Sequence, residues 1–401
     1  MSKNRTITSR RLRLFLAFAM FTANWLTTGM SQAQDASGAS PSSRNIGVPP
    51  ATESTRGDIS SDSLKAKSVE LWNTPSLEGS DLKAADVIPG DVDIVDGVYT
   101  HEVTRVQWRP ADPIDLYIVK PVGVKNPPVI LYLYSYPFET DRFLNHDFCK
   151  FLVRNGYAAI GFASALTGQR YHTPRPMKEW FVSQLPESLA TTAHDVQMIL
   201  TYMASRGDVD MNRVGIFGDG SGATIAILAA AVDPRIKTLD LLDPWGDWPD
   251  WIKESARVPG KERPDYLKPD WMAAVAPLDP VKWLPKLKTP NVRIQFIKDV
   301  LITPADVQQK IEAAIPSGPD FQIVHYDNTA AFRAAIAGGT GFDWIKQKMQ
   351  FRVVPDYSES GKPRGKFHPS TRKTHSNRLR AVREVVHRTQ EIRCRCPENI
   401  P

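Results

Sequence analysis

Cysteine and histidine are scarce in this chain, which has three cysteines and eight histidines among its 401 residues. Cys394 and Cys396 lie near the C-terminus without further ligands, and Cys149 stands alone in the body of the chain. Two thiols are too few for a structural metal site, and three are too few for a disulfide scaffold. We therefore expect no metal site, and we also expect no cofactor. Cys149 is expected to be a buried structural thiol.

The body of the chain lacks an excess of basic residues, although the whole sequence has a formal net charge of +6. The excess comes from the ends. Residues 1–13 carry five Lys or Arg and no acid, and residues 351–401 carry twelve Lys or Arg against five acids. The part between them is mildly acidic. A basic surface for nucleic acid is therefore not predicted for the folded part.

The chain also lacks an apolar run long enough to predict a membrane span. The apolar residues 14–26 follow five basic residues and precede residues 31–33, whose small side chains suit signal cleavage. This pattern predicts a signal peptide over residues 1–33, and hence export to the periplasm or the medium with no stable span after cleavage. Arg10 and Arg11 resemble a twin-arginine signal, so both the general secretory and the twin-arginine routes stay open.

Patterns of strands and helices alternate over residues 67–350, after a Ser- and Pro-rich segment at residues 34–66 that predicts a disordered linker. This alternation predicts one α/β domain with a mostly parallel sheet and helices on both faces. The expected strands are 99–108 and 114–121 as an antiparallel pair, then 127–137, 157–164, 214–217, 236–243, 291–299 and 321–327; the expected helices are 148–155, 188–207, 221–231 and 343–350.

Two further segments depart from this alternation. Residues 244–290 are dense in Pro and Trp and predict an insertion of short helices over the mouth of a site. Its Trp245, Trp248 and Trp251 would either line an apolar site or pack inside the insertion. Residues 351–401 predict a basic, poorly ordered tail, with a tether to a membrane surface or an anionic polymer as the alternative.

The segment FGDGSGA, residues 217–223, lies between an expected strand and an expected helix. A sharp turn in this position is where a nucleophilic serine is exposed in one large group of enzymes. If Gly218 and Gly222 flank the turn, Gly220 stands at its apex and Ser221 begins the helix as a capping hydroxyl. If the strand is one residue longer, Ser221 stands at the apex. Both registers are open, and the length of the strand favours Gly220.

This segment and three others resemble the α/β-hydrolase superfamily, and most of all its secreted branch related to prolyl peptidases and dienelactone hydrolases. The other three are PPVILYLYSYP, APLDPVKWLPKLKTP and RIQFIKD, and the resemblance spans residues 127–350. It implies an α/β-hydrolase fold in which Ser221 is the nucleophile, followed along the chain by an acid and then a base. It also implies oxyanion donors at Tyr136 and at the backbone of Gly222.

The sequence indicates the catalytic acid and base less clearly than it indicates the sharp turn. The resemblance implies Asp299 as the acid, with Asp243 after the preceding strand as the alternative. The loop after the last strand, where the base is expected, contains no histidine, so the candidates are His325 within that strand and His172 after the second buried strand. Each of these residues has a structural role as its alternative, because Asp commonly caps turns and a lone His is commonly structural.

Two functions follow from these residues. The first is an exported serine hydrolase of carboxylic esters or small amides. The second is an inactive or very weak member of the superfamily that binds a small ligand in the retained pocket, since a serine without a positioned base is a poor nucleophile. The expected partner is therefore a small molecule in either case, as a substrate or as a ligand.

Overall fold

The computed structural model describes residues 70–349, apart from 83, 85, 111, 137–139, 167–169, 171–183 and 340–342. The expected signal peptide, linker and tail, together with His172, lie outside these residues.

A mixed sheet of ten strands forms the centre of the described chain, in the order β1-β3-β4-β6-β5-β7-β8-β9-β10, with β2 also pairing with β3. The pairs among β1 to β4, and the pair of β4 with β6, are antiparallel; all pairs from β6 to β10 are parallel. This confirms the predicted α/β class. The strands are β1 Asp86–Ile88, β2 Val92–Val95, β3 Tyr99–Gln107, β4 Ile114–Pro121, β5 Pro128–Leu133, β6 Ala158–Phe162, β7 Asp210–Asp219, β8 Ile236–Leu242, β9 Asn291–Ile297 and β10 Phe321–Tyr326.

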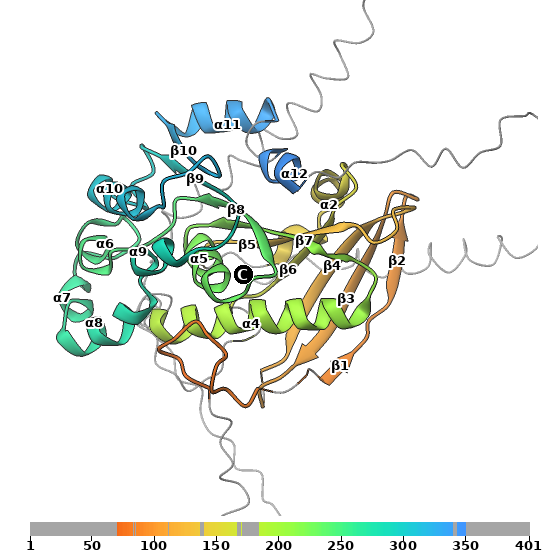
Figure 1. The fold of residues 1–401 in the computed structure, drawn as a ribbon, viewed down its shortest axis with the longest axis horizontal. Helices are drawn as coiled ribbons and strands as arrows, with labels where there is room; N and C mark the ends of the chain where they lie inside the picture. Colours follow the sequence, from red (N-terminus) through yellow and green to blue (C-terminus); the bar gives the residue numbers. More distant parts are fainter. Residues whose placement is uncertain are drawn as a thin grey trace, which may run out of the picture. The chain divides into compact units, whose positions relative to one another are not determined.

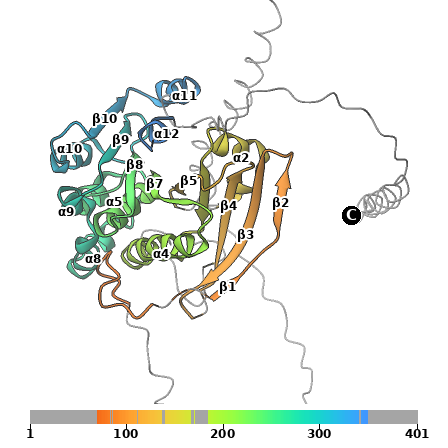
Figure 2. The same ribbon diagram turned by 45° about the vertical axis from the view of Figure 1, so that its right-hand side comes forward.

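Helices cover both faces of this sheet (Figures 1 and 2). Helices α4 (Leu185–Arg206) and α5 (Ser221–Val232) lie on one face, and α2 (His146–Val153) and α12 (Asp343–Met349) lie on the other. The remaining described helices are η1 Thr140–Leu144, α6 Trp248–Glu254, α7 Arg263–Tyr266, α8 Pro269–Val275, η3 Ala276–Leu278, α9 Pro280–Trp283, η4 Leu284–Lys286, α10 Ala305–Ala314 and α11 Thr329–Ala337.

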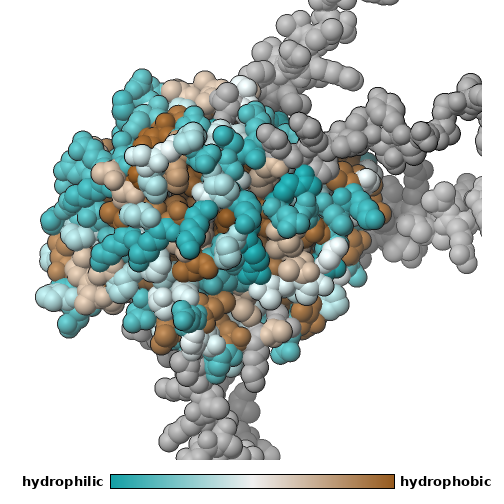
Figure 3. All heavy atoms as spheres, viewed as in Figure 1, coloured by the Kyte–Doolittle hydropathy of each residue, from teal (hydrophilic) through white to brown (hydrophobic). Residues whose placement is uncertain are grey.

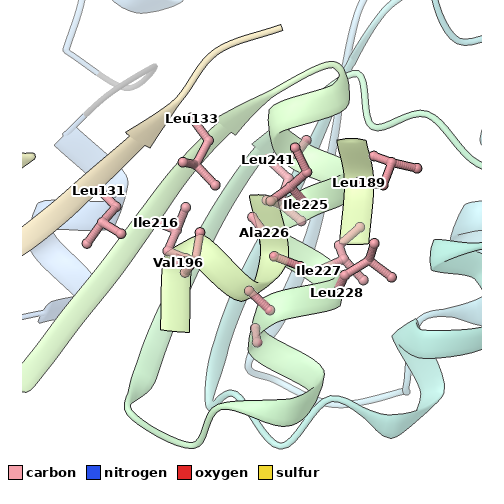
Figure 4. Close-up of a cluster of buried hydrophobic side chains, with 14 of the residues drawn as sticks. Leu131, Leu133, Leu189, Val196, Ile216, Ile225, Ala226, Ile227, Leu228 and Leu241 are labelled. Atoms are coloured by element: carbon pink, nitrogen blue, oxygen red, sulfur yellow. The ribbon is translucent and has the colours of Figure 1, made fainter. Parts of the chain in front are cut away.

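Alternate residues of the central strands point to opposite faces and build two cores. In β5, Leu131 and Leu133 pack in the cluster that contains α4 and α5, whereas Ile130 and Tyr132 pack in the cluster that contains α2 and α12. Figure 4 shows the first cluster, with side chains of α5 between the sheet and α4. Because ten of the twelve residues of α5 are buried, this helix is enclosed by protein and its N-terminus is firmly placed.

The carboxyl ends of the central parallel strands meet at one edge of the sheet. Leu133 of β5 pairs with Gly218 of β7, and Asp219 of β7 pairs with Leu242 of β8. Strand β5 lies between β6 and β7, so the strand order reverses direction there. Ligands of open α/β sheets bind outside the carboxyl ends of the strands at such a switch point. The segment after β5 and the turn after β7 therefore lie where a site is expected.

The insertion after β8 consists of short helices, as its sequence predicts, from α6 to η4. Trp245, Trp248 and Trp251 are all 0% exposed, and the rings of Trp245 and Trp251 stack with centroids 4.7 Å apart. Of the two roles expected for them, packing inside the insertion is the one that these contacts support. On the face drawn in Figure 3, hydrophilic and hydrophobic side chains are intermixed. No helix in the described part of the chain has both the length and the apolar character needed to cross a bilayer.

Candidate functional site

Gly220 forms the apex of the turn between β7 and α5. Strand β7 ends at Asp219 and helix α5 begins at Ser221, so the turn consists of Gly220 alone, with φ 57° and ψ −118°. This backbone conformation is unfavourable for a residue with a side chain and is open to glycine. Of the two registers that the sequence leaves open, the structure adopts the one with Gly220, not Ser221, at the apex.

The space in front of Gly220 is already filled. A Cβ atom built on Gly220 would lie 2.5 Å from Ser135 Oγ and 3.1 Å from Trp245 Nε1. Ser135 follows β5, and Trp245 follows β8. A side chain at position 220 would therefore require the Ser135 side chain to move and Trp245 to shift by a few tenths of an ångström, in addition to the cost of its backbone conformation.

The other two glycines of the turn allow α5 to approach the sheet closely. A Cβ on Gly222 would lie 2.2 Å from the carbonyl oxygen of Leu133, and a Cβ on Gly218 would lie 2.6 Å from Ala223 Cα. The glycines that suggested a sharp turn in the sequence are therefore required by backbone contacts.

Ser221 is buried and engaged in the first turn of α5. Its exposed fraction is 0%, and its Oγ accepts a hydrogen bond of 3.0 Å from the backbone N–H of Tyr136. The Tyr136 hydroxyl in turn accepts a hydrogen bond of 2.6 Å from Ser188 Oγ of α4. The expected nucleophile and the backbone N–H of an expected oxyanion donor thus bond to each other. No histidine of the described residues bonds to Ser221.

Asp299 and His325 have partners elsewhere. Asp299, in the loop after β9, accepts hydrogen bonds from the backbone N–H and the hydroxyl of Thr329 at 2.9 and 2.8 Å, at the start of α11. His325, on β10, lies 3.1 Å from Glu312 Oε1 and stacks on Phe296. The structure does not bring these two residues and Ser221 into one hydrogen-bonded triad.

Asp243, the alternative acid, supports the end of the sheet. Its carboxylate accepts a hydrogen bond of 3.0 Å from the Ile297 N–H, and its backbone carbonyl accepts one from the Thr303 hydroxyl at 3.0 Å. Burial raises the pKa of Asp243 well above its usual value. The remaining alternative, His172, lies outside the described residues. Cys149 is buried as expected, and burial raises the pKa of its thiol to about 11.

Asp219, immediately before the apex, is the perturbed carboxyl of this site. Burial raises its pKa to about 6, against the opposing effect of the Arg142 and Arg257 charges. Arg142 comes from η1, where its guanidinium lies 4.1 Å above the ring of Tyr134, and Arg257 follows α6 in the insertion. The carboxyl therefore titrates near neutral pH beside two cations.

Sequence reasoning passed over Asp219 and Arg257. Asp219 lies within the segment FGDGSGA, and its position at the end of an expected buried strand could have marked it as a candidate site residue. No sequence pattern marked Arg257, because its electrostatic effect on Asp219 depends on how the insertion folds. Among the described residues, no group of three or more His, Cys, Asp or Glu side chains is arranged to hold a metal ion.

No protein-family model matches this chain, and no curated protein matches its sequence. Solved structures do match its fold. Acetyl xylan esterase 1 from Thermoanaerobacterium sp. aligns with 69% of this chain and 92% of its own, at a TM-score of 0.55 and 14% identity. A cold-adapted esterase from an Arctic intertidal metagenomic library aligns with 67% of this chain and 100% of its own, at a TM-score of 0.44 and 15% identity. An acylaminoacyl peptidase from Pyrococcus horikoshii aligns with 63% of this chain and 40% of its own, at a TM-score of 0.45 and 14% identity.

At these identities the likeness concerns the fold alone. The chain has the α/β-hydrolase fold, which confirms the resemblance inferred from its sequence. A fold does not set an activity, so the activity has to be argued from the site.

Replacing Ser221 by Ala tests the structural role of its hydroxyl. The Ser221→Ala variant would leave the buried Tyr136 N–H without an acceptor, which costs about 1–3 kcal/mol of the free energy of unfolding. Urea denaturation measures this loss. Ser205→Ala, which removes an exposed hydroxyl bonded to the Tyr202 carbonyl of the same α4 helix, is the control and should change stability by less than about 0.5 kcal/mol. Equal stability of the Ser221→Ala variant and the native protein would contradict this role.

Asp219→Asn tests the half-buried Asp219 carboxyl. The folded pKa of Asp219 is about 6 against a model value of 3.8, so between these pH values the unfolded chain has released a proton that the folded chain still holds. The free energy of unfolding therefore falls as pH rises through this window. The full shift corresponds to about 3 kcal/mol, and solvent screening of this half-buried side chain lowers it, so we expect Asp219→Asn to gain about 2 kcal/mol over the native protein at pH 8 and little at pH 4. Urea denaturation at both values measures the difference, with Asp93→Asn on the exposed strand β2 as control. A gain independent of pH would contradict the assignment.

Proposed function

We propose that this protein binds a small molecule beside the turn between β7 and α5 without forming a covalent serine intermediate. One observation carries the proposal: Gly220 stands at the apex, and Ser135 and Trp245 fill the place of a nucleophilic side chain. Ser221, the nearest hydroxyl along the chain, is buried and bonded to the Tyr136 N–H. A hydroxyl held in this way has no base to activate it among the described residues.

The location of the turn supports binding. It lies at the switch point of the sheet, where α/β proteins bind their ligands. The Ser135 hydroxyl at the turn has no hydrogen-bond partner among the described residues. The basic and apolar pattern of residues 1–33 supports the further proposal that the protein is exported and acts on small molecules outside the cytoplasm.

Labelling with a fluorophosphonate probe tests this proposal. Such probes phosphonylate activated serines, so we expect the full chain to remain unlabelled under conditions that label an active serine esterase to completion. The folded state of the sample is checked by circular dichroism. Stoichiometric label on the native protein that is lost in the Ser221→Ala variant would overturn the proposal and establish a serine hydrolase.

A second candidate function is ester hydrolysis without a covalent intermediate, and Asp219 is the observation that favours it. A carboxylate with a pKa of about 6 is suited to act as a general base near neutral pH. It would accept a proton from water while the water oxygen bonds to the acyl carbon; the ester C–O bond then breaks, and the alcohol leaves with that proton.

Hydrolysis of p-nitrophenyl acetate measures this second candidate. If Asp219 is the base, the rate should rise with pH through about 6, since the ionised form accepts the proton. Asp219→Asn should then lower the rate by about a hundredfold, a typical contribution of general base catalysis, while Asp93→Asn should leave it unchanged. Equal rates for the native protein and the Asp219→Asn variant would exclude this candidate.

A further inference from the structure

Strands β1 and β2 together form one interrupted edge strand of the sheet. Both pair antiparallel with the same side of β3, β1 along residues 105–107 and β2 along residues 99–102. No other strand of the described chain pairs with either of them, and Figures 1 and 2 show both at the outer border of the sheet. An edge strand presents backbone N–H and C=O groups that can pair with another extended chain.

The break between the two strands is a β-bulge. The last pair of β1 joins Ile88 to Arg105. The first pair of β2 joins Val92 to Glu102, so three residues of the edge lie opposite two residues of β3. Pro89, within the bulge, has no N–H to donate. A partner strand would therefore pair mainly with β2, where the edge is regular.

Large apolar side chains on this edge are in contact with solvent. The exposed fraction is 67% for Ile88, 55% for Val92 and 69% for Ile94. Val92 and Ile94 lie two residues apart in β2, so they point to the same face of the sheet. Covering such side chains gains about 25 cal/mol for each Å² of apolar surface removed from water. Exposed apolar residues on an edge strand therefore favour pairing with another chain.

The charge of this edge is negative. Residues 86–98 contain four aspartates and no Lys or Arg. Asp86 and Asp91 are exposed, and Asp96 pairs with Lys150 at 2.6 Å. A second copy of this chain, paired edge to edge, would bring two acidic strands together, and like charges on facing strands are destabilising. Lys and Arg on a partner strand would instead be stabilised, so the charge favours a basic partner over a second copy.

We propose that the edge formed by β1 and β2 binds an extended segment of another protein in which basic and apolar residues alternate. Residues 91–94, DVDI, alternate acidic and apolar side chains, so they point to opposite faces as those of the partner would. The partner backbone would extend the sheet by one strand, and its apolar side chains would cover Val92 and Ile94. Strands β3, β4, β6 and β5 separate this edge from β7, so the surface is distinct from the turn at Gly220.

Fluorescence anisotropy of labelled synthetic peptides with the full chain tests the inference. We expect a peptide of alternating valine and lysine to bind at least about tenfold more tightly than one of alternating valine and glutamate, because only the basic peptide complements the charge of the edge. A third peptide has the valine–lysine sequence with methylated backbone nitrogens. It keeps the charge but cannot donate hydrogen bonds to a strand, so it should also bind at least about tenfold more weakly.

Two matched pairs of variants locate the contact. Ile94→Lys sets a like charge against the basic peptide and should weaken its binding about tenfold or more, whereas Ile323→Lys, on the opposite edge strand β10, should leave binding unchanged. The folding of both variants is checked by circular dichroism. Asp86→Asn combined with Asp91→Asn should weaken binding about threefold or more at low salt, and Asp270→Asn on the exposed surface of α8 is its control.

Equal binding of the valine–lysine peptide and its methylated form would show that charge alone attracts the peptide, and would overturn the inference. Equal effects of Ile94→Lys and Ile323→Lys would do the same, as would failure of the valine–lysine peptide to bind the full chain. Sedimentation velocity covers the remaining occupant. A dimer that dissociates in the Ile94→Lys variant would identify a second copy at this edge and would also overturn the inference.

Discussion

The hydrogen bond from the Tyr136 N–H to Ser221 Oγ joins the two segments on which the site depends. One follows β5 and the other opens α5, and the bond holds them together inside the protein. It fixes where Ser135 lies, and Ser135 in turn closes the space in front of Gly220. The Ser221 hydroxyl, for which the sequence predicted a nucleophilic role, accepts a hydrogen bond from a buried N–H.

Much of the fold was predictable because strand and helix patterns are local. The continuous apolar run that became β5 and the alternating run that became β4 were both recognisable, and α5 was expected from its apolar residues. The short strands β1 and β2 were not anticipated. Their exposed apolar residues have no alternating burial that a sequence pattern would reveal.

The candidate site was predictable only where residues are adjacent in sequence. The turn at Gly220 follows from FGDGSGA, but the register remained open until the end of β7 was fixed at Asp219. The roles expected for Asp299 and His325 came from their order along the chain, whereas the structure gives them Thr329 and Glu312 as partners. Contacts between distant segments, such as Arg257 acting on Asp219, have no signature in a single sequence.

The closed space in front of Gly220 also limits how this protein could change. A single substitution that places serine at the apex would meet Ser135 Oγ at 2.5 Å and Trp245 Nε1 at 3.1 Å, in a backbone conformation that opposes any side chain. A side chain at position 220 therefore requires the Ser135 hydroxyl to leave this space and the Trp245 ring to shift by a few tenths of an ångström. Position 220 is thus coupled to the segments after β5 and β8, and a substitution at the apex changes the packing of both.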